Sequence, residues 1–166
     1  MPSMTRRQQF TGLIGWFIVS FAVSAVGAIA SIEARSFYAG LEQPDWAPPG
    51  WLFGPVWTLL FALMAIAAWL VWRNGGFRTN RIALSLFLTQ LAFNALWSWL
   101  FFAWRLGGPA FADILLLWVL ILATLVAFWR AERLAGILLI PCLLSMRVPA
   151  LLNDTLPRRH PGPLRT

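Results

Sequence analysis

The sequence predicts an all-α integral membrane protein, organised as a bundle of five transmembrane helices. The chain of 166 residues is 60% hydrophobic and 11% charged, and its mean hydropathy is +0.71. A soluble domain of this length cannot bury so much apolar surface, so a lipid bilayer must be its solvent. The apolar residues also fall into long runs separated by polar connections. Because lipid offers no water to backbone groups, each run is predicted to be an α-helix.

Five apolar runs each come near the ~20 residues that cross a hydrocarbon core of about 30 Å. The connections 73–81, 105–109 and 130–133 are short, so neighbouring helices are expected to be antiparallel within one bundle. The first connection, 32–50, is long enough to fold over the end of the bundle as a lid. Residues 1–166 therefore form a single membrane domain, with helices predicted at 10–31, 51–72, 82–104, 110–129 and 134–153.

All 13 basic residues are arginines, and they lie mainly in the connections and tails. This distribution favours contact with membrane lipids and control of topology, not nucleic-acid binding. More arginines lie on the side of the N-terminal tail than in the connections of the opposite side, so the N-terminus is predicted to be cytoplasmic. Arg6 and Arg7 precede an apolar run longer than the core of a secretory signal, and we interpret that run as the first transmembrane helix.

The most distinctive motif occupies residues 44–57 and reads PDWAPPGWLFGPVW. Proline fixes φ and removes a backbone donor, so the segment before Trp51 is predicted to be stiff and extended. Pro55 inside the second helix is expected to bend it and leave room beneath the lid. An indole offers a broad apolar face and one N–H donor, which suits a membrane interface or a flat ligand.

The third predicted helix places Gln90, Asn94, Trp97 and Phe101 on one face, at i, i+4, i+7 and i+11. Amides at membrane depth are costly without partners, so this face is expected to point into the bundle. Two interpretations remain open at this point. The amides form hydrogen bonds between helices, or they supply polar contacts to a ligand beside Trp97.

Other polar residues favour structural roles. Asp113 opens the fourth run, where a carboxylate suits a helix N-terminus better than a functional site. Ser20, Ser24 and Ala28 form a small-residue stripe, which favours packing within the chain over a dimer interface. Tryptophans beside arginines at helix ends are expected in the aromatic belt of the membrane interface: Trp69, Trp72, Trp104 and Trp129.

No catalytic or metal-binding group is predicted. The single cysteine, Cys142, excludes an intrachain disulfide and a multi-cysteine metal site, and the one histidine, His160, lies in the C-terminal tail. No nucleophile is paired with a base, and no phosphate-binding loop is present.

These motifs resemble the TspO/MBR family of tryptophan-rich sensory proteins and mitochondrial translocator proteins. The resemblance is carried by YAGL at 38–41, by the Pro/Trp motif at 44–57 and by Gln90-x3-Asn94-x2-Trp97-x3-Phe101-Phe102. It implies a five-helix bundle, often dimeric, that binds porphyrins such as haem and protoporphyrin IX beneath the first connection. Carried over by position, the ligand-binding residues are Tyr38, Trp46, Trp51, Trp57, Asn94 and Trp97.

The last helix departs from the family pattern. The family's Pro-Tyr-x-x-Trp is replaced around Pro141, so that Cys142 stands at the tyrosine position and Ser145 at the tryptophan position. Arg147 and Pro149 weaken this helix further. Some family members are reported to degrade porphyrin in light through two pocket tryptophans, of which only Trp57 is matched here, so the departure argues against catalysis. The missing tyrosine likewise argues against the family's sterol motif.

The resemblance thus implies a membrane sensor or translocator for tetrapyrroles. It needs no obligatory cofactor; its expected partners are a porphyrin or another planar hydrophobic ligand, membrane lipids and a second copy of the chain. The alternatives are a light-dependent porphyrin-degrading enzyme and a structural membrane subunit without a ligand.

Overall fold

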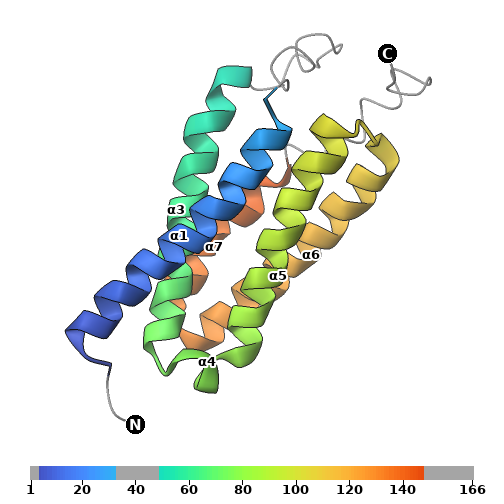
Figure 1. The fold of residues 1–166 in the computed structure, drawn as a ribbon. Coiled ribbons are helices and arrows are strands. Elements are labelled where there is room, and N and C mark those ends of the chain that lie inside the picture. The colour runs from blue at the N-terminus through green and yellow to red at the C-terminus, as the bar shows by residue number, and fades with distance from the viewer. Residues whose placement is uncertain (1–3, 33–48, 148–166) are drawn as a thin grey trace.

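The computed structural model describes residues 4–32 and 49–147, and these residues form helices and short connections, with no strand among them (Figure 1). Four helical segments are long and apolar enough to cross a membrane: Arg6–Ala30, Gly54–Arg73, Arg81–Ala103 and Gly107–Ala131. A shorter apolar helix spans Arg133–Ser145. The expectation of an all-helical membrane protein is therefore confirmed for the described residues.

The helix boundaries follow local chemistry as well as hydrophobicity. Helix α1 (Arg6–Ala30) begins before the predicted residue 10 because Thr5 and Gln8 form a capping box. The Gln8 amide N–H donates to Thr5 Oγ1, and the Thr5 N–H donates to Gln8 Oε1. The 3₁₀ turn η1 (Gly50–Leu52) leads into α3 (Phe53–Arg73), and α4 (Gly76–Thr79) is a single turn in the next connection.

The remaining helices are α5 (Arg81–Ser98), its continuation η2 (Trp99–Ala103), α6 (Gly107–Ala131) and α7 (Arg133–Ser145). A turn at Met146 ends α7, and 148–153 of the helix predicted at 134–153 lie outside the described residues. The exposed Arg147 follows this turn and is again helical.

The four long helices and the shorter α7 pack as a closed ring. Helix α1 packs against α3 and α5, while α7 packs against α3 and α6, and contacts between α5 and α6 complete the circuit (Figure 1). The order around the ring is therefore α1, α3, α7, α6, α5, and α5 lies between α1 and α6. Small residues allow these approaches. A Cβ on Gly12 would fall within the Trp72 ring, and a Cβ on Gly27 would lie 3.3 Å from Ser98 Oγ.

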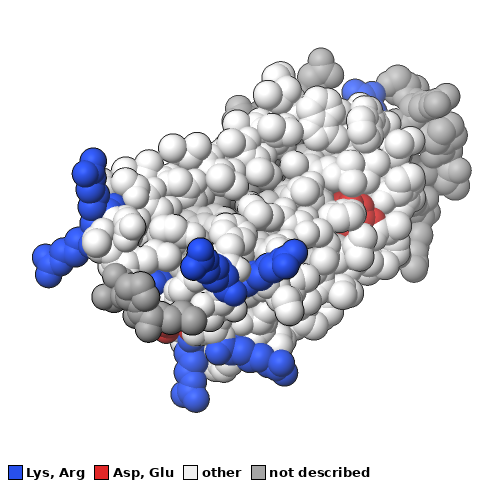
Figure 2. All heavy atoms as spheres, turned by 60° about the horizontal axis from the view of Figure 1, so that its bottom comes forward, with Lys and Arg blue, Asp and Glu red and all other residues white. Residues whose placement is uncertain are grey.

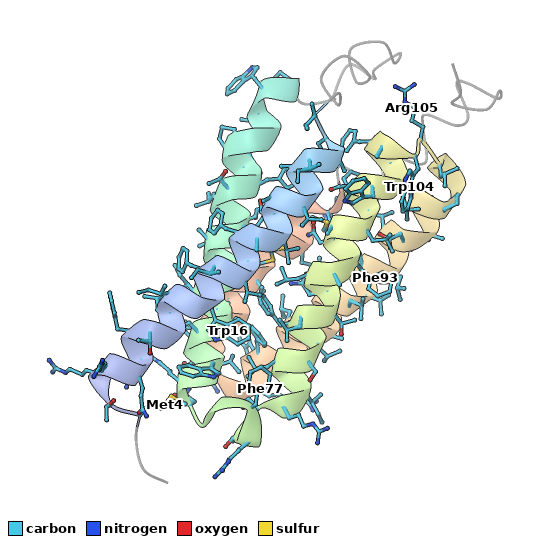
Figure 3. The ribbon with its side chains drawn as sticks, in the orientation of Figure 1. Met4, Trp16, Phe77, Phe93, Trp104 and Arg105 are labelled. Atoms are coloured by element: carbon cyan, nitrogen blue, oxygen red, sulfur yellow. The ribbon has the colours of Figure 1, made fainter. Side chains whose placement is uncertain are left out.

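The middle of the ring is closed by side chains from three helices. The Gln90 side-chain amide donates to Met64 Sδ at 3.5 Å, and the Cys142 thiol donates to the same sulfur at 3.6 Å. Towards α4, Phe87 stacks on Phe128 with ring centroids 5.7 Å apart and meets the edge of Trp16. Trp16 and Phe77 lie together at this end (Figure 3), so the α4 end of the bundle has an aromatic core.

Two expectations about single residues are wrong. Pro55 lies in the first turn of α3, where its missing N–H would have no helical partner in any case. It therefore removes no hydrogen bond from the helix interior and gives no reason for a bend there. Asp113 lies two turns into α6, beyond the reach of a helix terminus, and it is buried. The carboxyl group therefore does not cap the helix.

The small-residue stripe and the aromatic belt are confirmed in part. Ser20 is fully buried within the single chain, as packing inside the chain requires, whereas Ala28 is exposed. Trp104 and Trp129 are exposed near helix ends. Trp69 and Trp72 instead contact α1: the Trp69 indole N–H donates to the Gln9 carbonyl at 2.8 Å, and Trp72 covers Gly12.

Charge is distributed unevenly along the bundle. Figure 2 shows arginines gathered at one end, with little charge over the rest of this face. That end holds the start of α1, the helix α4 and the connection between α6 and α7. Among the described residues it carries Arg6, Arg7, Arg73, Arg78, Arg81, Arg130 and Arg133, whereas Arg105 and Arg147 lie at the opposite end.

Candidate ligand-binding site

The candidate site lies in the half of the bundle away from α4. Helix α1 ends and α3 begins at this end, so the connection that joins them starts and finishes beside the site (Figure 1). Tyr38 and Trp46 fall in this connection, outside the described residues, and their assignment stays a prediction. The hydrogen-bonded cluster of Gln90, Met64 and Cys142 closes the ring below the site.

One face of α5 forms the inner wall. Gln90, Asn94, Trp97 and Phe101 are exposed by 1%, 4%, 5% and 4%, so the expectation that this face points into the bundle is confirmed. A helix rises about 1.5 Å per residue, which places Trp97 about 10 Å from Gln90 along the axis. Asn94 and Trp97 therefore form successive layers between the Met64 cluster and the end of the bundle.

This wall presents polar atoms without partners. Gln90 Oε1, Asn94 Nδ2 and Trp97 Nε1 are buried, and no described residue hydrogen-bonds to them. A buried polar group without a partner costs about 1–3 kcal/mol, which is why such groups are uncommon in folded proteins. Hydrogen bonding between helices therefore accounts only for the weak amide–sulfur contact of Gln90. The remaining polar atoms of this face have no partner among the described residues.

Two further helices carry buried polar atoms without a hydrogen-bond partner. Ser20 of α1 is fully buried, and its hydroxyl oxygen has no partner among the described residues. Asp113 of α6 is 6% exposed, and its Oδ2 is likewise unpaired there. Polar residues at membrane depth are a signal that can be read in the sequence. Which neighbouring helices these two residues face depends on the order of the helices around the ring, which the sequence does not give.

The aromatic part of the wall is well ordered around Trp97. Its indole stacks on Phe101 with centroids 5.3 Å apart and planes inclined by 11°, and Phe102 meets it edge-on at 5.7 Å. On α3, the half-buried Trp57 packs against Phe61 at 6.1 Å. Trp51 is 66% exposed, so it stands apart from the buried rings. Its role also stays a prediction.

An irregular turn shapes the end of this wall. The segment η2 is a π-helix, in which the Trp104 N–H donates to the Trp99 carbonyl at 2.8 Å. This turn carries Phe101 to the stacked position beside Trp97, and it ends before Trp104 and Arg105, which lie at the end of the bundle (Figure 3). Sequence periodicity does not reveal such a turn.

Helix α7 carries Cys142 and Ser145 at the positions where this sequence departs from the family's tyrosine and tryptophan. Cys142 is fully buried against Met64. The half-buried Ser145 donates its hydroxyl to the Cys142 carbonyl at 2.8 Å. The described residues contain no group of three or more His, Cys, Asp or Glu side chains that could hold a metal ion.

Comparison with known proteins identifies the family. The model of the TspO/MBR family matches residues 16–158, which is most of the chain. The chain belongs to the TspO/MBR family. Among its relatives, the translocator protein of Homo sapiens is 39% identical over 132 residues, covering 78% of each chain. Protein CrtK of Rhodobacter capsulatus is 36% identical over 150 residues, covering 89% of this chain and 91% of the relative.

A tryptophan-rich protein TspO from Archaeoglobus fulgidus is 35% identical over 132 residues, covering 79% of this chain and 85% of the relative. The TspO/MBR match includes all six positions predicted to bind a ligand, from Tyr38 to Trp97. Four of these positions lie among the described residues, and the buried wall brings Asn94 and Trp97 together on α5.

Proposed function

We propose that this TspO/MBR protein binds porphyrins and related planar tetrapyrroles within the membrane and acts as their sensor or translocator. The observation that supports the proposal is the inner face of α5, where unpaired polar atoms of Asn94 and Trp97 lie beside stacked aromatic rings. A porphyrin has a flat apolar face that suits an indole, and a polar edge that suits buried donors. No obligatory cofactor is needed, because the porphyrin is the ligand.

The proposal includes an arrangement in the membrane. Helix α7 and the chain that follows it form the fifth span, and the arginine-rich end faces the cytoplasm together with the N-terminus. The connection from α1 to α3 then lies on the opposite side and covers the site, with Tyr38 and Trp46 as part of the cover. The protein acts as a homodimer, as the family resemblance implies.

A porphyrin titration tests the proposed site. Protoporphyrin IX is added to the purified protein in detergent, and binding is followed by the porphyrin's own absorbance, so that loss of a tryptophan does not remove the signal. Trp97→Leu and Trp57→Leu each remove a ring from the proposed walls, and we expect about tenfold weaker binding from the lost stacking and burial.

The matched control is Trp118→Leu, which removes an indole that is 37% exposed on α6. It is expected to bind as tightly as the parent protein. Equal weakening by all three substitutions would show that the porphyrin adsorbs to tryptophans in general. Absence of saturable binding in the parent protein would favour a structural subunit without a ligand.

A further inference from the structure

A shallow groove lies on α6, in a part of the surface that the proposed porphyrin site does not use. Its volume is about 400 Å³. The lining residues recur at i, i+3, i+4, i+7, i+8 and i+11, so they share one helical face. They are Val119, Leu122, Ala123, Val126, Ala127 and Arg130.

The groove faces away from the interior of the bundle. The side chains of α6 that pack inward, among them Leu117, Ile121 and Phe128, are buried and line a different face. In the groove, the half-buried Ala123 and Ala127 form a low floor. Exposed aliphatic side chains, Val119 by 57% and Val126 by 43%, rise beside that floor. The groove is thus a shallow apolar surface that runs along the helix.

Its length matches one leaflet of a bilayer. From Val119 to Arg130 the helix rises about 16 Å, roughly half of the ~30 Å hydrocarbon core. Arg130 lies in the last turn of α6, next to the exposed Trp129. A tryptophan and an arginine at a helix end are typical of the head-group level. The groove therefore extends from the middle of the membrane to the head groups.

The charge at the head-group end is positive. Arg130 is exposed and belongs to the arginine-rich end of the bundle. Within the described ranges the only acid at that end is Glu132, whose Oε2 accepts a hydrogen bond from Asn74 Nδ2 at 3.0 Å. A phosphate is the group that complements an arginine at this depth.

We propose that this groove binds an anionic phospholipid of the leaflet at the arginine-rich end, with an acyl chain over Ala123 and Ala127 and the phosphate on Arg130. The alternative occupant is a second copy of the chain. A two-fold dimer through this face would bring the two exposed Arg130 side chains close together at the head-group level, where their like charges repel. The charge thus favours a lipid over a dimer.

Native mass spectrometry of the purified protein with defined lipids tests the assignment. The protein is mixed with phosphatidylglycerol or phosphatidylcholine in detergent, and the retained lipid is counted over a titration. The parent protein is expected to retain phosphatidylglycerol in preference to phosphatidylcholine. Arg130→Gln should weaken phosphatidylglycerol binding about fivefold, the share expected of one arginine near an anionic head group. Arg130→Lys keeps the charge and should retain the preference.

Two further variants separate the groove from general electrostatics. Arg78→Gln removes an exposed arginine of α4 at the same end but outside the groove, and it should leave binding unchanged. Ala127→Leu fills the floor and should reduce retention of phosphatidylglycerol while Arg130 is intact. Equal losses from Arg130→Gln and Arg78→Gln would overturn the proposal, as would equal retention of both lipids. Conversion of a dimer to a monomer by Ala127→Leu, without a change in bound lipid, would assign the groove to a second copy.

Discussion

At the buried Asn94, the stability of the ligand-free protein and the binding of a ligand are expected to make opposite demands on the side chain. It is 4% exposed, and its Nδ2 has no partner among the described residues. Replacing an unsatisfied polar group by an apolar one of similar shape removes a desolvation cost of about 1–3 kcal/mol. Asn94→Leu should therefore raise the midpoint of thermal unfolding of the ligand-free protein, measured in detergent by loss of helical circular dichroism. It should also weaken porphyrin binding.

Thr89→Val is the control for added hydrophobicity on the same helix. Thr89 is exposed on α5, and its hydroxyl donates to the Ser85 carbonyl within the helix. The control should change neither the thermal midpoint nor porphyrin binding appreciably. A lower midpoint for Asn94→Leu would mean that the amide has a stabilising partner, and the interpretation of Asn94 as a ligand contact would then fail.

At the same scale, the sequence predicted which face of α5 is buried but not what that face would meet. The spacing of Gln90, Asn94, Trp97 and Phe101 was sufficient, because a period of 3.6 fixes which side chains share a face. Asp113 was misassigned because its position relative to the helix start depends on where α6 begins, at Gly107. The contact of Gln90 with Met64 joins two helices, and no local pattern encodes it.

At the scale of the element, the hairpin of α6 and α7 depends on one glycine. A Cβ on Gly136 would lie 2.9 Å from the Cα of Trp129 and 2.8 Å from its ring, closer than real Cβ contacts permit. Because backbone must move to relieve this overlap, Gly136→Ala should destabilise the protein by about 1–3 kcal/mol. The measurement is unfolding in detergent, followed by circular dichroism.

Gly15→Ala is the matched control for Gly136→Ala. Apart from the backbone of its own helix and its chain neighbours, no atom lies within 4 Å of the Cβ that it would add to α1. An alanine in a helix interior is favoured over glycine by about 0.5–1 kcal/mol, so this variant should be as stable as the parent or slightly more so. Equal stability of both variants would show that α6 and α7 do not approach as closely as the structure indicates.

The ends of elements were the least predictable part of the fold, for identifiable reasons. Hydropathy placed the start of α1 at residue 10, but the polar capping box of Thr5 and Gln8 extends the helix into the head-group region. Pro55 was expected to bend a helix interior, yet α3 begins only at Phe53. The π turn at Trp99–Ala103, which ends the helix begun by α5, was not predicted, because hydrophobic periodicity does not distinguish it from an α-helical turn.

For the whole molecule, five apolar runs predicted a single bundle, and the described helices form one. The order around the ring was beyond the sequence, since short connections require only that successive helices be neighbours or nearly so. Helix α5 contacts α1 and α6, whereas α7 returns to α3, which closes the ring. The unpaired polar atoms of Ser20, Asn94 and Asp113 therefore belong to three neighbouring helices of this ring, α1, α5 and α6. Glycines occur where helices of the ring approach each other closely.

The orientation proposed for this bundle in the membrane rests on the distribution of its arginines, and it can be tested with single cysteines. The chain's one cysteine, Cys142, is fully buried, so a membrane-impermeant maleimide should not label the parent protein. Gly108→Cys places a thiol at the exposed start of α6, and Arg78→Cys places one at the arginine-rich end. Because arginine-rich connections stay in the cytoplasm, intact bacterial spheroplasts should label Gly108→Cys alone. Arg78→Cys should react only after the membrane is permeabilised. The opposite pattern would place the connection from α1 to α3, and the proposed porphyrin entry beside it, on the cytoplasmic side.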